Sequence, residues 1–140
     1  FPPNHEKGLF LDAREETESM RNIMTRMLSA LGKVRDAAGD TPVLVALLPA
    51  PEHVSTSQFR AKLEGLGLAA DQHRFGLARK RLADRAKTAG FRVVDVAEAL
   101  ASNADIDSLF IPGDFHYSPA GHSAVADVLR PHVERSLRAR

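Results

Sequence analysis

The sequence predicts an α/β fold with a parallel sheet, because two successions of helix, glycine and strand follow one another along the chain. In the first, an apolar periodicity of three and four residues ends at Gly39, and the apolar run VLVALLP follows at 43–49. In the second, a helical pattern ends at Gly90, and FRVVDV follows at 91–96. Strands that alternate with helices are typical of parallel sheets whose faces the helices cover.

Length and composition favour one compact domain, since the chain has 140 residues, of which 44% are hydrophobic. The 19 basic and 18 acidic residues give a formal charge of +1, so nucleic acid is not an expected partner. No apolar run approaches the roughly 20 residues that a membrane-spanning helix needs. Cysteine is absent, which fits either redox compartment and leaves the localisation open. Because the chain begins at Phe1 without an initiating methionine, we expect it to be a piece of a longer protein.

Periodicity and turn residues place the remaining elements. Helices are expected over 12–37, 57–64, 71–89 and 96–100, and a closing helix from Ser118 to Leu137. Ser118 suits the N-cap and Pro119 the first helical position, where a backbone N–H is not needed. Gly121 in the first turn lets the backbone approach a neighbour closely. A short last strand is expected at 108–112.

Candidate functional residues lie in two loops. The loop PAPEHVSTS follows the first strand at its carboxyl end, where open α/β sheets place ligands, so His53 either borders a site or is a surface histidine. The loop PGDFHY before the closing helix holds Asp114 and His116. A histidine there can accept a proton from a nucleophile, and a nearby carboxylate can hold its tautomer and stabilise the imidazolium. The alternative is a surface aspartate beside a capping histidine.

From Thr41 to Leu129 the chain resembles the C-terminal half of an SGNH-type (GDSL-like) hydrolase domain. The order of VLVALLP, PAPEHV, KTAGFRVVDVAEAL and GDFHYSPAGHSAVADVL carries the resemblance. Members of this superfamily close with an Asp and a His shortly before a helix, and a glycine follows the histidine by five positions, as Gly121 follows His116. The resemblance implies a three-layer α/β/α sandwich with a parallel sheet, the flavodoxin-like architecture of these hydrolases. Residues 1–140 are then a single domain or the C-terminal portion of one.

The resemblance implies that His116 is the general base and Asp114 its orienting carboxylate. The activity it implies is hydrolysis or transfer of an acyl group, with a small-molecule or glycan ester as substrate and with no metal or organic cofactor. Many esterases of the superfamily have the aspartate three residues before the histidine, where this chain has Gly113. The two-residue spacing is similar to the branch related to polysaccharide O-acetylation, which favours acetyl groups on glycans. The resemblance also slightly favours an extracytoplasmic location.

The family's nucleophile block, a serine in a Gly-Asp-Ser turn after the first strand, is absent from this sequence. The similar letters GDT at Gly39–Thr41 precede a strand instead of following one, and Ser118 is better used as a helix cap. Asn4 is either the tail of the block that supplies an oxyanion asparagine or a solvated terminal residue. We therefore expect the chain alone to be inactive, with the serine upstream in the rest of the parent domain.

Three alternatives stay open at this point. The first is an inactive SGNH-like module that binds glycans or another partner and lacks the nucleophile altogether. The second is a metal site formed by Asp114, His116 and His122, whose side chains are competent ligands. The third is a plain α/β interaction domain in which the Asp-x-His motif is incidental.

Overall fold

The computed structural model describes residues 12–103 and 105–138 of the chain. Its helices are α1 (Glu18–Ala38), α2 (Thr56–Gly65), α3 (Leu77–Thr88), α4 (Ala97–Ala101) and α5 (Pro119–Arg138). Its strands are β1 (Leu44–Leu47) and β2 (Arg92–Asp95), and short 3₁₀ turns occur at Pro51–His53, Ala70–Gln72 and Asp107–Leu109. The fold class is therefore mixed α/β, as the alternation of helix and strand predicts.

The two strands pair in parallel, in a register that sets Val45 beside Val93 and Leu47 beside Asp95. Within the described residues the sheet consists of this pair. The prediction of a parallel sheet is confirmed, and both strands are shorter than their apolar runs. The chain leaves β1 through Leu48 and Pro49, so the loop that contains His53 begins at the carboxyl end of the strand.

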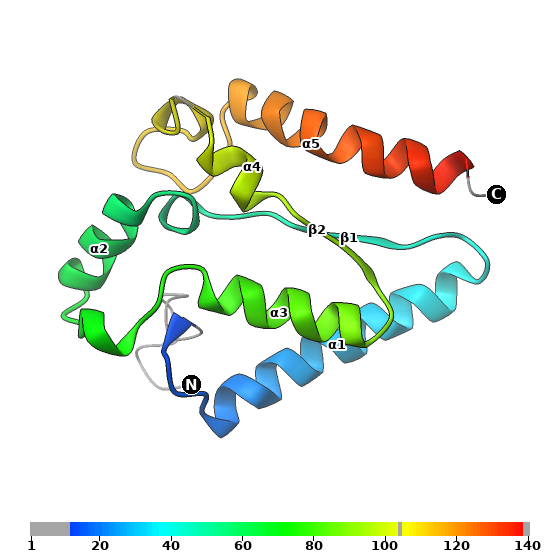
Figure 1. Ribbon diagram of the computed structural model, residues 1–140, viewed down its shortest axis with the longest axis horizontal. Coiled ribbons are helices and arrows are strands. Elements are labelled where there is room, and N and C mark those ends of the chain that lie inside the picture. The colour runs from blue at the N-terminus through cyan, green and yellow to red at the C-terminus, as the bar shows by residue number, and fades with distance from the viewer. Residues whose placement is uncertain (1–11, 104, 139–140) are drawn as a thin grey trace.

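Helices pack on both faces of the strand pair. On one face, Val45 and Val93 share an apolar cluster with residues of α1 and α3, namely Leu28, Leu31 and Ala86. On the other face, Leu44 and Val94 share a cluster with residues from α4 to α5, namely Ala97, Leu100, Leu109, Phe110, Val125 and Val128. Figure 1 shows α1 and α3 on one side of the strands and α4 and α5 on the other. Because side chains alternate between the faces of a strand, burial on both faces accounts for the continuous apolar run at 43–49.

The strand predicted at 108–112 does not form. Residues Asp107–Leu109 make a 3₁₀ turn, and Phe110 makes an isolated antiparallel bridge with Tyr117. The chain reverses between these two residues, where Gly113 adopts a φ of +78°, a value that residues with a side chain rarely adopt. Leu109 and Phe110 of this run are buried in the cluster with α5 without joining the sheet, which explains why the apolar pattern suggested a strand.

Two helices begin later than the periodicity predicts, because of their caps. α1 begins after Thr17, whose hydroxyl accepts a hydrogen bond from the backbone at the first turn. α3 follows Gly76, which has no side chain to cap the helix. The carboxylate of Asp12 supplies the acceptor instead, 2.8 Å from the Ala78 N–H. Asp12 is fully buried, so a residue remote in sequence caps α3 from inside the molecule.

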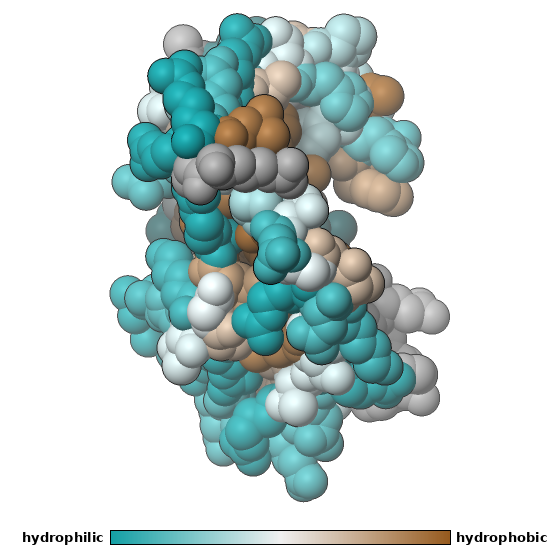
Figure 2. All heavy atoms as spheres, turned by 90° about the vertical axis from the view of Figure 1, so that its right-hand side faces the viewer, coloured by the Kyte–Doolittle hydropathy of each residue, from teal (hydrophilic) through white to brown (hydrophobic). Residues whose placement is uncertain are grey.

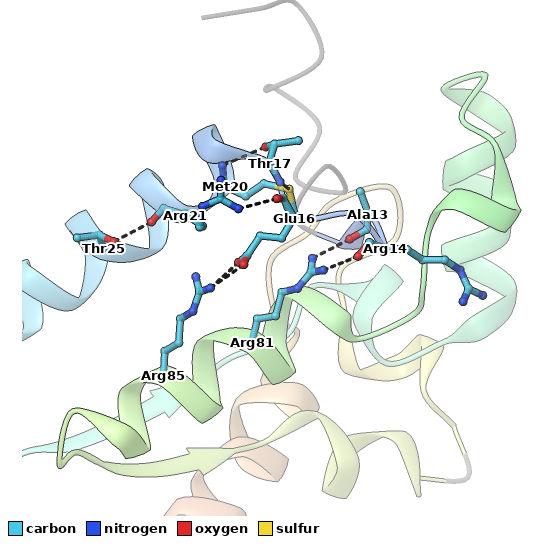
Figure 3. A network of polar contacts seen from close by, with 9 residues as sticks. All are labelled: Ala13, Arg14, Glu16, Thr17, Met20, Arg21, Thr25, Arg81 and Arg85. Carbon is cyan, nitrogen blue, oxygen red and sulfur yellow. Dashed lines mark hydrogen bonds and ion pairs between the residues drawn. The ribbon is translucent and has the colours of Figure 1, made fainter.

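Arginines of α3 hold the segment that precedes α1. The Arg81 guanidinium donates to the carbonyl oxygens of Ala13 and Arg14 over 2.7 and 2.8 Å. One turn further along, Arg85 forms an ion pair of 2.6 Å with Glu16. Figure 3 shows both arginines pointing from α3 toward this segment. The start of the described chain is therefore attached to the same helix that Asp12 caps.

The end of the molecule where α5 finishes and β1 begins has a mainly hydrophilic surface, with apolar residues in small patches (Figure 2). A shallow groove at this end is lined in part by Pro42, Leu44, Val133 and Leu137. In the described ranges, no helix combines the length and the apolar character needed to cross a membrane.

Candidate active site

Asp114 and His116 form a hydrogen-bonded pair in the loop before α5. The Nδ1 atom of His116 lies 2.7 Å from the Oδ1 atom of Asp114. The same oxygen accepts hydrogen bonds from the backbone N–H groups of Phe115, at 2.6 Å, and His116, at 3.3 Å. An ionised carboxylate accepts hydrogen bonds and cannot donate them, so a neutral imidazole that bonds to Asp114 carries its proton on Nδ1. Its Nε2 atom then has the lone pair that can take up a proton.

The surroundings of Asp114 favour its ionised form. The hydrogen bond from the His116 side chain lowers the pKa of the Asp114 carboxyl below its ordinary value, and the two backbone N–H groups lower it further. Desolvation acts in the opposite direction and is outweighed. The carboxylate is therefore negative over the physiological pH range.

The loop reverses tightly around the pair. The Ile111 N–H donates to the His116 carbonyl oxygen over 2.9 Å, and the Asp114 N–H donates to the Ile111 carbonyl oxygen over the same distance. At the base of the loop, the Ser118 N–H donates to the Leu109 carbonyl oxygen over 3.0 Å. This tight turn brings the side chains of Asp114 and His116, which are two positions apart in the sequence, into contact.

Tyr117 attaches this loop to the carboxyl end of β1. Its phenol donates a hydrogen bond of 2.6 Å to the carbonyl oxygen of Pro49. Burial raises the pKa of Tyr117 to about 12, so the phenol keeps its proton and remains a donor. Sequence reasoning missed this residue, although it is the single tyrosine of the chain and follows His116 directly. The contact sets the pair near the strand end where α/β sheets carry their sites.

The first turn of α5 fits closely under the loop, as predicted for Gly121. A β-carbon at Gly121 would lie 2.0 Å from the Leu109 carbonyl oxygen and 2.9 Å from a ring carbon of Tyr117. Ser118 caps the helix, since its hydroxyl accepts from the Gly121 N–H over 3.1 Å and donates to the Ser108 carbonyl oxygen over 2.5 Å. Both hydroxyl functions of Ser118 are used in the cap, so it is not a free nucleophile.

A cleft runs beside Asp114, between the loop and α2. It comprises two adjoining hollows of about 250 and about 430 Å³, which share Pro51, Gln58, Gly113 and Asp114 as lining residues. The side-chain amide of Gln58 donates to a carboxylate oxygen of Asp107 over 2.8 Å. This bond leaves the amide oxygen of Gln58 available as an acceptor at the edge of the cleft. Sequence reasoning did not identify α2 as part of the site.

His53 pairs with Asp12 and not with Asp114 or His116. Its Nε2 atom lies 3.5 Å from the Oδ2 atom of Asp12, and neither atom has a hydrogen-bond partner among the described residues. Asp12 was not singled out in the sequence, because its carboxylate acts on Ala78, which lies far along the chain. His53 therefore faces the buried carboxylate that caps α3.

The other candidates do not join the pair. The rings of His122 and Tyr117 pack in a T-shaped arrangement, at a centroid distance of 5.8 Å. In the part of the chain that the structure describes, no group of three or more His, Cys, Asp or Glu side chains is arranged to hold a metal ion, so the alternative with Asp114, His116 and His122 lacks support. The GDT letters at Gly39–Thr41 lie between α1 and β1, before the strand. Asn4 lies outside the described residues.

Comparisons with family models, with characterised proteins and with solved structures found no match for this chain. The chemistry that the chain can perform is therefore inferred from its own side chains. Among these, Asp114 and His116 form an ionised carboxylate hydrogen-bonded to an imidazole at the edge of a cleft.

Proposed function

We propose that the chain is the His–Asp part of an SGNH-type serine esterase or O-acyltransferase. In this proposal His116 is the general base, Asp114 is its orienting carboxylate, and the serine nucleophile lies upstream in the full-length protein. The observation that carries the proposal is the 2.7 Å contact between His116 Nδ1 and Asp114 Oδ1. An isolated surface histidine does not need such a partner, whereas a general base does, because the carboxylate fixes the tautomer.

The proposed mechanism is acyl transfer in two steps. The serine oxygen attacks the ester carbonyl carbon while His116 Nε2 takes the hydroxyl proton, and Asp114 stabilises the imidazolium that forms. When the tetrahedral intermediate collapses, the ester C–O bond breaks and the imidazolium returns the proton to the leaving alkoxide. Water or a sugar hydroxyl then attacks the acyl carbon while His116 Nε2 takes its proton, the C–O bond to the serine breaks, and the imidazolium returns the proton to the serine oxygen. This chemistry requires no metal and no organic cofactor.

The fold supports this proposal at the level of architecture. We infer a three-layer α/β/α sandwich for the complete domain, in which further parallel strands extend the pair of β1 and β2. Helices already pack on both faces of this pair, which is the arrangement that such a sandwich requires. The His116 loop is attached to the end of β1, where the sites of open α/β sheets lie.

The cleft beside Asp114 supports an ester of a carbohydrate or of another small polar alcohol as the substrate. Its lining combines the amide of Gln58 and the ion pair of Lys62 and Glu52 with the exposed ring of Phe115. Amide and carboxylate groups can bond to hydroxyls, and the face of an aromatic ring can pack against the C–H face of a sugar.

An inactive SGNH-like module that binds glycans or another partner is the second candidate. It has the same fold and cleft but no nucleophile, so it differs from the first candidate only in whether a serine reacts. The absence of the Gly-Asp-Ser block from this chain is compatible with both candidates.

Fluorophosphonate labelling of the full-length protein separates the two candidates. For the enzyme, we expect one covalent adduct on a serine upstream of this chain, mapped by mass spectrometry, and loss of the adduct in His116→Ala. His132→Ala, a histidine of α5 remote from the loop, is the matched control and should label normally. Folded protein without any adduct would contradict the enzyme and support the binding module.

A further inference from the structure

The side chain of Tyr117 makes the contacts that tie the His116 loop to the body of the molecule. Besides its hydrogen bond to Pro49, its ring stacks on Phe110 with a centroid distance of 5.0 Å and an interplanar angle of 28°. Its Cδ1 atom also lies next to Gly121, in space that a β-carbon would need. The ring is thus enclosed by a strand end, the opposite side of the loop and the first turn of α5.

The pair itself has no comparable anchor. The side chains of Asp114 and His116 are 40% and 65% exposed, and Phe115 between them is 71% exposed. Among the described residues, the hydrogen bonds made by residues 111–116 all stay within the loop. Where the pair sits relative to the sheet therefore depends on the residues at the ends of the loop.

We propose that Tyr117 is a positioning residue, whose hydrogen bond to the Pro49 carbonyl holds the Asp114–His116 pair at the carboxyl end of β1. The inference rests on the proposed function, because the position of the pair matters only where a nucleophile must meet His116 Nε2. Tyr117 acts through the loop and does not touch the reacting atoms. A displacement of about 1 Å can cost about 100-fold in rate when a catalytic group and a nucleophile must meet.

Tyr117→Phe tests this role, because it keeps the ring and its packing and removes only the hydroxyl. Ser136→Ala is the matched control. Its hydroxyl accepts from the Arg92 side chain over 2.9 Å and donates to the His132 carbonyl oxygen over 2.8 Å, near the other end of α5. Both variants lose one hydroxyl that links distant parts of the chain, but only the first loosens the loop.

Two readouts are compared in the full-length protein. The first is amide hydrogen exchange at Ile111, whose N–H bonds across the loop to the His116 carbonyl. We expect Tyr117→Phe to raise this exchange rate about fivefold, as the loss of one hydrogen bond predicts. The second is the fluorophosphonate labelling rate, which we expect to fall about tenfold or more. Ser136→Ala should change neither readout.

The outcomes separate this inference from the function on which it rests. If the wild type is labelled and Tyr117→Phe is labelled equally fast, the positioning role is wrong while the proposed function stands. If the wild type is not labelled, the proposed function is wrong, and Ile111 exchange decides whether Tyr117 anchors the loop. Unchanged exchange in Tyr117→Phe would then overturn the anchoring as well, and faster exchange would support it.

Discussion

Gly121 lies against the carbonyl oxygen of Leu109 so closely that a β-carbon at this position would come within 2.0 Å of that oxygen. This approach brings the first turn of α5 under the loop that carries His116. Gly121→Ala should therefore destabilise the protein by about 2–3 kcal/mol, because the helix must shift away from a backbone atom. Urea unfolding of the two proteins measures the difference.

Gly32 provides the matched control for that substitution. It lies within α1, and a β-carbon there meets no atom within 4 Å. Gly32→Ala should stabilise the protein by about 0.5–1 kcal/mol, because alanine favours the helix over the unfolded chain. Destabilisation of similar size in both variants would show that the contact with Leu109 is not what makes Gly121 necessary.

Asp12 should contribute to stability through the start of α3. Asp12→Ala leaves the Ala78 N–H without its acceptor and should cost about 1–2 kcal/mol. Asp12→Asn keeps an oxygen acceptor at the same place and should cost less. Equal losses in thermal or urea unfolding would indicate that the charge of Asp12, and not its bond to Ala78, is what matters.

Tyr117 can be titrated directly, because it is the only tyrosine and the chain has no tryptophan. Burial raises its pKa from the ordinary value of 10.0 to about 12. Above pH 10 the unfolded chain loses this proton while the folded chain retains it, so folding stability should fall as the pH rises from 10 to 12. Ultraviolet absorbance of the phenolate measures the midpoint, and a midpoint near 10 in folded protein would contradict the burial of the phenol.

Asp114 should show the opposite pH dependence. Because the hydrogen bond from His116 lowers the pKa of the folded carboxyl, its contribution to stability is present above the unfolded value and is lost as the pH falls through the folded value. Carboxyl ¹³C shifts measure the Asp114 titration. The midpoint should rise in His116→Ala and stay unchanged in the control His132→Ala.

The helices and both strands could be predicted from the sequence because their signals are local. Apolar spacing marks α1 and α5, and Ser118 with Pro119 marks the start of α5. The contact between Asp114 and His116 could also be predicted, because two side chains that are two positions apart in one tight turn lie close together. The apolar run near Phe110 misled the prediction because burial against α5 produces the same pattern as a buried strand.

Contacts between distant residues could not be predicted in this way. Tyr117 reaches Pro49 across 68 positions of sequence, and Asp12 reaches Ala78 across 66. No local spacing encodes either contact, because each depends on how β1 and α3 pack in three dimensions. The cleft between α2 and the His116 loop could not be predicted from the sequence for the same reason.

The role of His116 depends on which ring nitrogen carries the proton when the imidazole is neutral. Long-range ¹H–¹⁵N NMR of the neutral form measures this directly, with Asp114→Asn as the comparison. We predict a proton on Nδ1, bonded to Asp114, and a bare Nε2 that is able to accept a proton from a nucleophile. A proton on Nε2 in the wild type would contradict the assignment of His116 as a general base oriented by Asp114.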